Sequence, residues 1–171
     1  MVPRRMSHGP LLALSAAVLA ASSAHAQAVP AAPTSDATAE VRTAVERVYR
    51  DGIAAFNRHA LAEFSAGFGD DVAMYTPTGW LRGLPAVRAR FDSTFRQFPR
   101  VRMEIDSLEV RAVGADAATV AFRWRVFPTG AGPAFHGVGS GTYVRRAGRW
   151  VEVLEHETVV RVDPELQQRR P

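Results

Sequence analysis

The 171-residue chain contains no cysteine and no lysine. Without cysteine, neither a disulfide nor a zinc–thiolate site can form, so the stability of a folded domain must come from packing. Without lysine, arginine supplies all the basic side chains apart from histidine, with 21 basic against 17 acidic residues. Because these charges are nearly balanced and the arginines are scattered, the composition argues against a nucleic-acid partner.

The first 26 residues have the organisation of a secretory signal peptide. Arg4 and Arg5 precede the apolar run Leu11–Ala21, and the tripeptide AHA (residues 24–26) has the small-x-small pattern of a cleavage site. The run is shorter than the roughly 20 residues that span a bilayer. We therefore expect cleavage after residue 26, a periplasmic or secreted protein, and no stable membrane insertion. The export route, general or twin-arginine, is left open, and the Ala- and Pro-rich residues 27–37 are predicted to be a flexible tether.

Apolar periodicity predicts three helices, and then strands only. Helical spacing indicates helices over Thr38–Arg58 and Leu61–Phe68, followed by the short strand Val72–Thr76 and a turn. A third helix begins after Gly83. Its predicted apolar face consists of Val87, Phe91, Phe95 and Phe98. This order is typical of an α+β fold, and we expect one domain over residues 38–162 with a tail over residues 163–171.

The second half of the chain alternates as strands do. Alternation begins at Val101, changes parity near Asp106, where it predicts a β-bulge, and resumes from Val120 to Val126. Two further strands, Phe135–Arg146 and Arg149–Val160, are predicted to form a hairpin. The G-x-G-x-G of residues 137–141 precedes no helix, so it indicates sheet bending or close backbone approach rather than a phosphate loop.

Three stretches resemble the NTF2-like superfamily, in particular its SnoaL-like domains. They are AAFNRHALAEFSAGFGDDVAMYTPTG (residues 54–79), GLPAVRARF (83–91) and RRAGRWVEVLEHET (145–158). The resemblance covers about Val41–Val160 and implies a cone, in which three N-terminal helices pack on a curved antiparallel sheet and leave a pocket at the wide end. Ala60 occupies a position where the family usually has Asp. The family includes isomerases, cyclases, dehydratases and binding modules, so the fold does not define the function.

The faces of the hairpin depend on its turn at Ala147-Gly148. A two-residue turn needs a positive φ at Ala147, so we favour a three-residue loop with Gly148 in the left-handed conformation. That register pairs Arg145 with Arg149. The alternative register is shifted by one residue and would place His136 and His156 on opposite faces.

In the favoured register, His136 and His156 share one face of the hairpin, while Glu155 and Glu157 lie on the other. His156, within VLEHETVV (residues 153–160), is the strongest candidate for a general acid/base, because imidazole titrates near neutral pH. A buried structural histidine remains the alternative interpretation, and His136 is a second candidate for the pocket.

Other candidate site residues are aromatic or acidic. Tyr75 is a candidate oxyanion donor, and Asp106, at the predicted bulge, is a candidate base. We expect the ligand to contact Phe56, Tyr75, Trp80, Trp124, His136 and His156. His59, His136 and His156 lack metal-ligand spacing, so no metal or cofactor is predicted.

Three functions remain open at this point. The first is the binding of a small, largely apolar ligand. The second is a lyase or isomerase reaction with His156 or Asp106 as general base and Tyr75 as donor. The third is homodimerisation through the sheet. No tight catalytic constellation is present, so ligand binding is favoured and enzymatic activity is left undecided.

Overall fold

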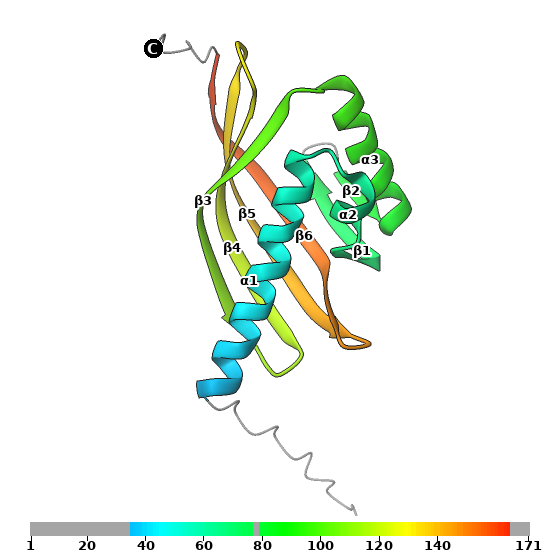
Figure 1. Ribbon diagram of the computed structural model, residues 1–171, viewed down its shortest axis with the longest axis vertical. Helices are drawn as coiled ribbons and strands as arrows, with labels where there is room; N and C mark the ends of the chain where they lie inside the picture. Colours follow the sequence, from blue (N-terminus) through cyan, green and yellow to red (C-terminus); the bar gives the residue numbers. More distant parts are fainter. Residues whose placement is uncertain (1–34, 77–78, 165–171) are drawn as a thin grey trace, which may run out of the picture. The chain divides into compact units, whose positions relative to one another are not determined.

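The computed structural model describes residues 35–76 and 79–164, which contain three helices and six strands (Figure 1). The predicted signal peptide and most of the predicted tether and tail lie outside the described residues. The last residues of the predicted tether, Ser35–Ala37, belong to the first helix, and Asp163 belongs to the last strand. Within the described residues, no helix is long and apolar enough to cross a membrane.

The strands form a sheet in the order β2-β1-β6-β5-β4-β3. Their bounds are Phe68–Thr76 (β1), Gly79–Arg82 (β2), Val101–Ala112 (β3), Ala117–Pro128 (β4), Ala134–Arg146 (β5) and Arg149–Asp163 (β6). From β3 to β6, neighbouring strands are antiparallel as predicted, but β1 pairs with β6 in parallel. The prediction of a wholly antiparallel sheet is therefore wrong. A long connection, rather than a hairpin, joins these two strands, and it permits the parallel direction.

The short strands near the start of the sheet also differ from the prediction. β1 begins at Phe68 rather than Val72, because the second helix is shorter than predicted. Trp80 lies in β2, a strand that the sequence pattern did not predict. The bulge expected near Asp106 is confirmed, since the pairing of β3 with β4 shifts between Ile105 and Ser107.

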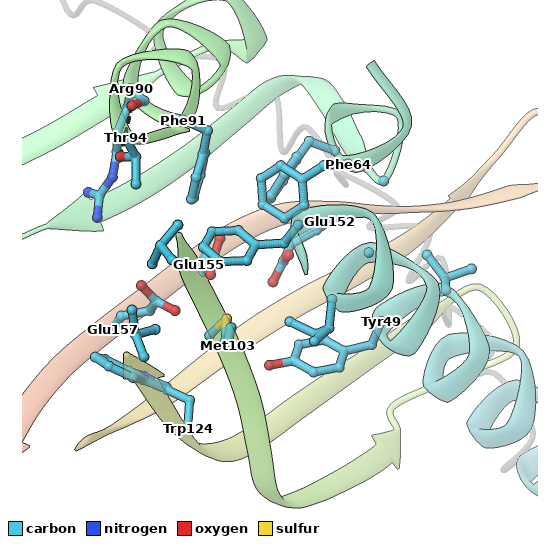
Figure 2. A pocket seen from close by; sticks show the side chains of 18 of the residues that line it. Tyr49, Phe64, Arg90, Phe91, Thr94, Met103, Trp124, Glu152, Glu155 and Glu157 are labelled. Carbon is cyan, nitrogen blue, oxygen red and sulfur yellow. Dashed lines mark hydrogen bonds between the residues drawn. The ribbon is translucent and has the colours of Figure 1, made fainter. Parts of the chain in front are cut away.

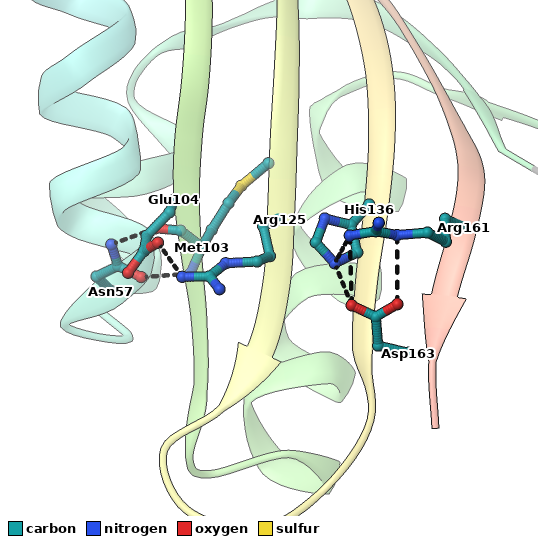
Figure 3. A network of polar contacts seen from close by, with 7 residues as sticks. All are labelled: Asn57, Met103, Glu104, Arg125, His136, Arg161 and Asp163. Carbon is teal, nitrogen blue, oxygen red and sulfur yellow. Dashed lines mark hydrogen bonds and ion pairs between the residues drawn. The ribbon is translucent and has the colours of Figure 1, made fainter. Parts of the chain in front are cut away.

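Helix α1 (Ser35–Asn57) lies across one face of the sheet and packs against β3 (Figure 1). Its buried residues recur at helical spacing, as predicted: Val41, Val45, Tyr49 and Phe56. The end of α1 is tied to β3 by two hydrogen bonds (Figure 3). Asn57 Nδ2 donates to the Met103 carbonyl oxygen (2.8 Å), and the Met103 N–H donates to Asn57 Oδ1 (2.7 Å). These bonds fix the C-terminal end of α1 to β3, an edge strand of the sheet.

Helices α2 (Leu61–Ser65) and α3 (Leu84–Gln97) complete the core with aromatic rings. Phe64 of α2 makes edge-to-face contacts with Phe56, Phe68, Phe91 and Phe95. The predicted face of α3 is confirmed for Val87, Phe91 and Phe95, which are buried, but Phe98 lies beyond the helix end and is exposed. The aromatic cluster therefore joins all three helices beside β1.

Three glycines of β5 make room for large side chains from neighbouring strands. A Cβ at Gly137 would overlap the ring of Trp124, and one at Gly139 would overlap the ring of Phe122. A Cβ at Gly141 would overlap a carboxylate oxygen of Glu152. The G-x-G-x-G motif therefore serves close approach, as its position in a strand predicts.

The β5–β6 hairpin turns on two residues, Ala147 and Gly148. Their φ angles are 48° and 77°, and Arg146 pairs directly with Arg149. The predicted three-residue loop is therefore wrong. Ala147 accepts the left-handed conformation because a two-residue turn of this kind matches the twist of the flanking strands.

A bulge at Val153 then changes which side chains of β6 share a face. Tyr143 pairs with Glu152, but its neighbour Thr142 pairs with Leu154, so Val153 is an extra residue. Beyond the bulge, Glu155 lies on the same face as Glu152. His156 pairs with Ser140 and lies on the opposite face.

Candidate functional site

A pocket of about 210 Å³ lies between α1, α3 and the face of the sheet that these helices cover (Figure 2). Most of its walls are apolar: Val48, Ile53 and Phe56 of α1, Phe64 of α2, Phe91 of α3, Val101 and Met103 of β3, and Trp124 and Val126 of β4. Phe135 and Val159 also line it and are partly exposed, so they mark the end that meets solvent. The remaining wall is polar and comes mainly from β6.

Three glutamates of β6 line this pocket: Glu152, Glu155 and Glu157 (Figure 2). Without the bulge at Val153, strand alternation would turn Glu152 away from the other two. Only 5% of Glu152 and 9% of Glu155 is exposed. Gly141 of β5 leaves the space that the Glu152 carboxylate fills. Two buried carboxylates therefore lie within an otherwise apolar cavity.

The apolar surroundings raise the pKa values of all three carboxyl groups. Burial raises the pKa of Glu152 to about 8, even though a hydrogen bond from Tyr143 acts to lower it. Burial also raises the pKa of Glu155 well above its usual range, and the charges of Glu152 and Glu157 raise it further. The pKa of Glu157 is raised by burial, while the guanidinium of Arg90 acts to lower it.

The tyrosines beside these glutamates remain protonated. Burial raises the pKa of Tyr49 and of Tyr143, and the negative charges of Glu152 and Glu155 add to both shifts. The Tyr143 hydroxyl donates a hydrogen bond to Glu152 Oε2 at 3.1 Å. Both tyrosines line the pocket, so each supplies a neutral hydroxyl group there.

Three buried polar atoms of the pocket have no hydrogen-bond partner within the described part of the chain. They are Glu152 Oε1, Glu155 Oε2 and Trp124 Nε1. Leaving a buried donor or acceptor unsatisfied costs about 1–3 kcal/mol, so native proteins rarely do so without an occupant nearby. The pocket thus offers two acceptors and one donor to a bound molecule.

The structure separates the residues that the sequence predicted as ligand contacts. Phe56 and Trp124 line the pocket. Tyr75, Trp80 and His156 instead meet on the outer face of the sheet, where the Tyr75 ring lies 5.1 Å from Trp80 and 5.5 Å from His156. His156 is exposed and contacts Thr158 Oγ1 at 3.2 Å. The predicted pocket position of His156 is therefore wrong, because the bulge at Val153 reverses its face.

The other two predicted acid/base residues also lie outside the pocket. His136 is held by the end of β6, with its Nε2 2.9 Å from Asp163 Oδ2 and Arg161 beside it (Figure 3). Asp106 is exposed at the bulge of β3. None of His136, His156 and Asp106 lines the pocket, so the expected shared cavity does not form.

The predicted grouping of Glu155 and Glu157 on the face opposite His136 and His156 is confirmed. Sequence reasoning nevertheless assigned the pocket to the face of the histidines and placed Glu152 with them, because it assumed unbroken alternation along β6. The useful signal was their spacing, since Glu152, Glu155 and Glu157 share a face only if one residue bulges between the first two. The glycines across the hairpin gave a second signal, because a strand without side chains on one face leaves space opposite.

No metal site is formed in residues 35–76 and 79–164. No three histidine or acidic side chains of these residues lie close enough together to hold a metal ion. The three glutamates therefore line the pocket without forming a metal-ligand cluster.

The SnoaL-like domain model matches residues 45–153, well over half of the chain. The chain belongs to the SnoaL-like domain family. This confirms the resemblance carried by the three sequence stretches. No curated protein shows significant similarity to this SnoaL-like protein.

Solved structures share the fold at low sequence identity. A hexachlorocyclohexane dehydrochlorinase (LinA) of type 2 has a TM-score of 0.68 and 14% identity, over 78% of this chain and 94% of that one. A candidate scytalone dehydratase from Novosphingobium aromaticivorans DSM 12444 has a TM-score of 0.68 and 17% identity, over 77% of this chain and 91% of that one. An NTF2-like protein of unknown function from Pseudomonas putida KT2440 has a TM-score of 0.65 and 17% identity, over 71% of this chain and 87% of that one. These likenesses support an NTF2-like α+β fold.

Proposed function

We propose that this SnoaL-like domain binds a small, largely apolar molecule in the pocket between α1, α3 and the sheet. The observation that carries the proposal is an apolar cavity in which two buried glutamate oxygens and one indole N–H lack partners. Ligand sites typically combine mainly apolar walls with a few polar groups that fix orientation. The polar groups here come from β4 and β6, on the sheet side of the pocket.

NMR titration with 2-phenylethanol, a neutral aromatic probe, tests this function. We expect the signals of residues around Phe91, Met103 and Glu155 to shift in a saturable manner. Val159→Trp, at the mouth of the pocket, should abolish these shifts. The matched variant Val160→Trp changes the adjacent, exposed residue, which does not line the pocket, and should preserve them. Equal binding to both variants would contradict the assignment.

A second candidate function is proton transfer on the bound molecule, as a lyase or isomerase performs it. The observation that favours it is the pKa of Glu152, raised to about 8, because a general base works best when its pKa lies near the operating pH. The base in this proposal is Glu152 or Glu155, with the Tyr49 hydroxyl as donor. The dehydratase and dehydrochlorinase that share the fold support reactions of this class.

Deuterium exchange of a weakly acidic ketone tests the proton transfer. With 2-indanone in heavy water, the protein should accelerate exchange of the protons next to the carbonyl. Glu155→Gln and Glu152→Gln should lower the rate, by about 10²–10⁴-fold for the residue that serves as base. His156→Ala and Asp106→Asn change residues outside the pocket and should leave the rate unchanged. A rate that falls for these controls, and not for the glutamate variants, would contradict the assignment.

We also propose that the domain acts outside the cytoplasm. The pattern of residues 1–26 supports export, with cleavage after residue 26. The intact mass of the protein from the periplasmic or secreted fraction should correspond to a chain that starts at Gln27. A mature protein that still carries Leu11–Ala21 would contradict export by cleavage.

A further inference from the structure

The acidic wall of the pocket is unusual because its carboxylates have so few internal partners. Glu152 receives one hydrogen bond, from Tyr143, and its Oε1 has no partner within the described residues. Glu155 Oε2 is likewise buried without a partner there. Glu157 adds a third carboxyl group to the same wall. Carboxyl groups of this kind are stabilised by hydrogen-bond donors and by positive charge.

The protein supplies little positive charge to this wall. Arg90 of α3 is the cation that lines the pocket, and no ion pair joins it to an acidic residue of the described chain. Its guanidinium lies over the ring of Phe91, 5.6 Å from the ring centre. Burial without a paired charge disfavours the ionised form of these carboxyl groups, which is why their pKa values are raised. A cation from outside would favour the ionised form and pair with it.

The shape and lining of the pocket define which cation fits. The carboxylates do not form a metal-ligand cluster, so a bare metal ion lacks the set of ligands that it needs. The walls around them include the rings of Phe56, Phe64 and Phe91. Aromatic faces attract ammonium groups and also pack against an apolar body. A protonated amine on a small apolar skeleton matches both features.

We propose that the ligand of this pocket is a small apolar amine whose ammonium group donates hydrogen bonds to Glu152 and Glu155. The inference rests on the proposed binding function and names the chemical class of its ligand. Glu152 Oε1 and Glu155 Oε2 each accept one N–H, and Glu157 contributes charge at longer range. The skeleton of the amine lies against the phenylalanine rings of the two longer helices.

Calorimetry with three matched probes tests this inference. The probes 2-phenylethylamine, 2-phenylethanol and phenylacetate have similar skeletons and are cationic, neutral and anionic at neutral pH. We expect the amine to bind at least about tenfold more tightly than the alcohol, which corresponds to about 1.4 kcal/mol, and phenylacetate to bind most weakly. Equal affinity for amine and alcohol would overturn the inference.

Variants separate this inference from the binding function itself. Glu155→Gln should remove most of the preference for the amine while the alcohol still binds. Arg90→Gln removes a competing cation and should strengthen amine binding. Glu104→Gln, at an exposed position of β3, should change neither the preference for the amine nor the affinity for it. Circular dichroism is used to check that each variant is folded. An amine preference that survives in Glu155→Gln and Glu152→Gln would overturn the inference.

Failure of the amine inference and failure of the proposed binding function give different results in these experiments. If amine and alcohol bind equally and Val159→Trp blocks both, the pocket is a binding site but its ligand is not selected by charge. If neither probe binds the wild-type protein at millimolar concentration, the proposed binding function fails together with the inference.

Discussion

At the scale of single residues, the glycines of β5 decide whether the pocket wall can form. Gly137 and Gly139 accept the rings of Trp124 and Phe122, and Gly141 accepts the carboxylate of Glu152. The sequence pattern allowed close approach to be predicted at these positions. It did not reveal which side chains approach, because those come from two other strands and depend on their registers.

Replacing Gly137 by alanine should destabilise the protein. The added methyl group would overlap the Trp124 ring and lie 2.6 Å from the Thr158 carbonyl oxygen, and overpacking of this kind costs about 1–3 kcal/mol. Urea unfolding measures the change. Gly114→Ala is the matched control, since nothing lies within 4 Å of its added Cβ, and it should have little effect. Equal stability of the two variants would contradict the packing described here.

The buried carboxyl group of Glu152 should make stability depend on pH. Its pKa is about 8 in the folded protein and 4.5 in an ordinary environment. Between these values the folded state holds a proton that the unfolded chain releases, so the free energy of unfolding falls as pH rises from about 4.5 to about 8. Each unit of pKa difference corresponds to about 1.4 kcal/mol.

Glu152→Gln cannot ionise, so its unfolding free energy should fall less steeply over that range. Urea unfolding at a series of pH values measures both proteins, and Glu109→Gln, an exposed residue, serves as control. The stability of the wild-type protein relative to Glu152→Gln should be lowest at and above pH 8. Parallel pH dependences for the two proteins would show that Glu152 is not buried as described.

At the scale of helices and strands, helices with a strong apolar stripe could be predicted, and β6 could not. In α3, Phe91 and Phe95 are four residues apart, which is helical spacing, and both are buried. In α1, Val45 belongs to a buried stripe with the same spacing. In β6, one inserted residue at Val153 exchanges the two faces, and strand alternation alone does not reveal it. The histidines were therefore assigned to the pocket and the glutamates were not, although the reverse holds.

The hairpin turn offers a direct test of its geometry. Ala147 adopts a φ of 48°, which costs a residue with a Cβ roughly 1–2 kcal/mol. Ala147→Asn places a residue favoured in such turns before Gly148 and should raise the free energy of unfolding by up to about 1 kcal/mol. Ala121→Asn, at an exposed strand position, should lower it. A destabilising Ala147→Asn would indicate the three-residue loop instead.

At the scale of the whole domain, the outer face of the sheet carries several large apolar side chains that are exposed. Four of them come from four adjacent strands: Tyr75, Trp80, Val138 and Leu154. Contiguous exposed apolar surface is typical of interaction sites. The sequence predicted a homodimer formed through the sheet, and this face is where we propose that a second copy binds.

Sedimentation equilibrium tests the homodimer. Leu154→Arg places a charge on the outer face and should shift the protein toward monomer, whereas Glu40→Arg, at an exposed position of α1 on the opposite face of the sheet, should not. A wild-type protein that is monomeric at high micromolar concentration would contradict dimerisation through this face.

The central claim is that the carboxyl groups of β6, rather than the histidines, form the polar wall of the pocket. NMR detection of the glutamate side-chain carboxyl carbons across a pH titration measures this directly. The structure predicts that Glu152, Glu155 and Glu157 titrate at clearly higher pH than an ordinary glutamate. If all three titrate near 4.5, the ordinary value for glutamate, they face solvent, and the account of the pocket is wrong.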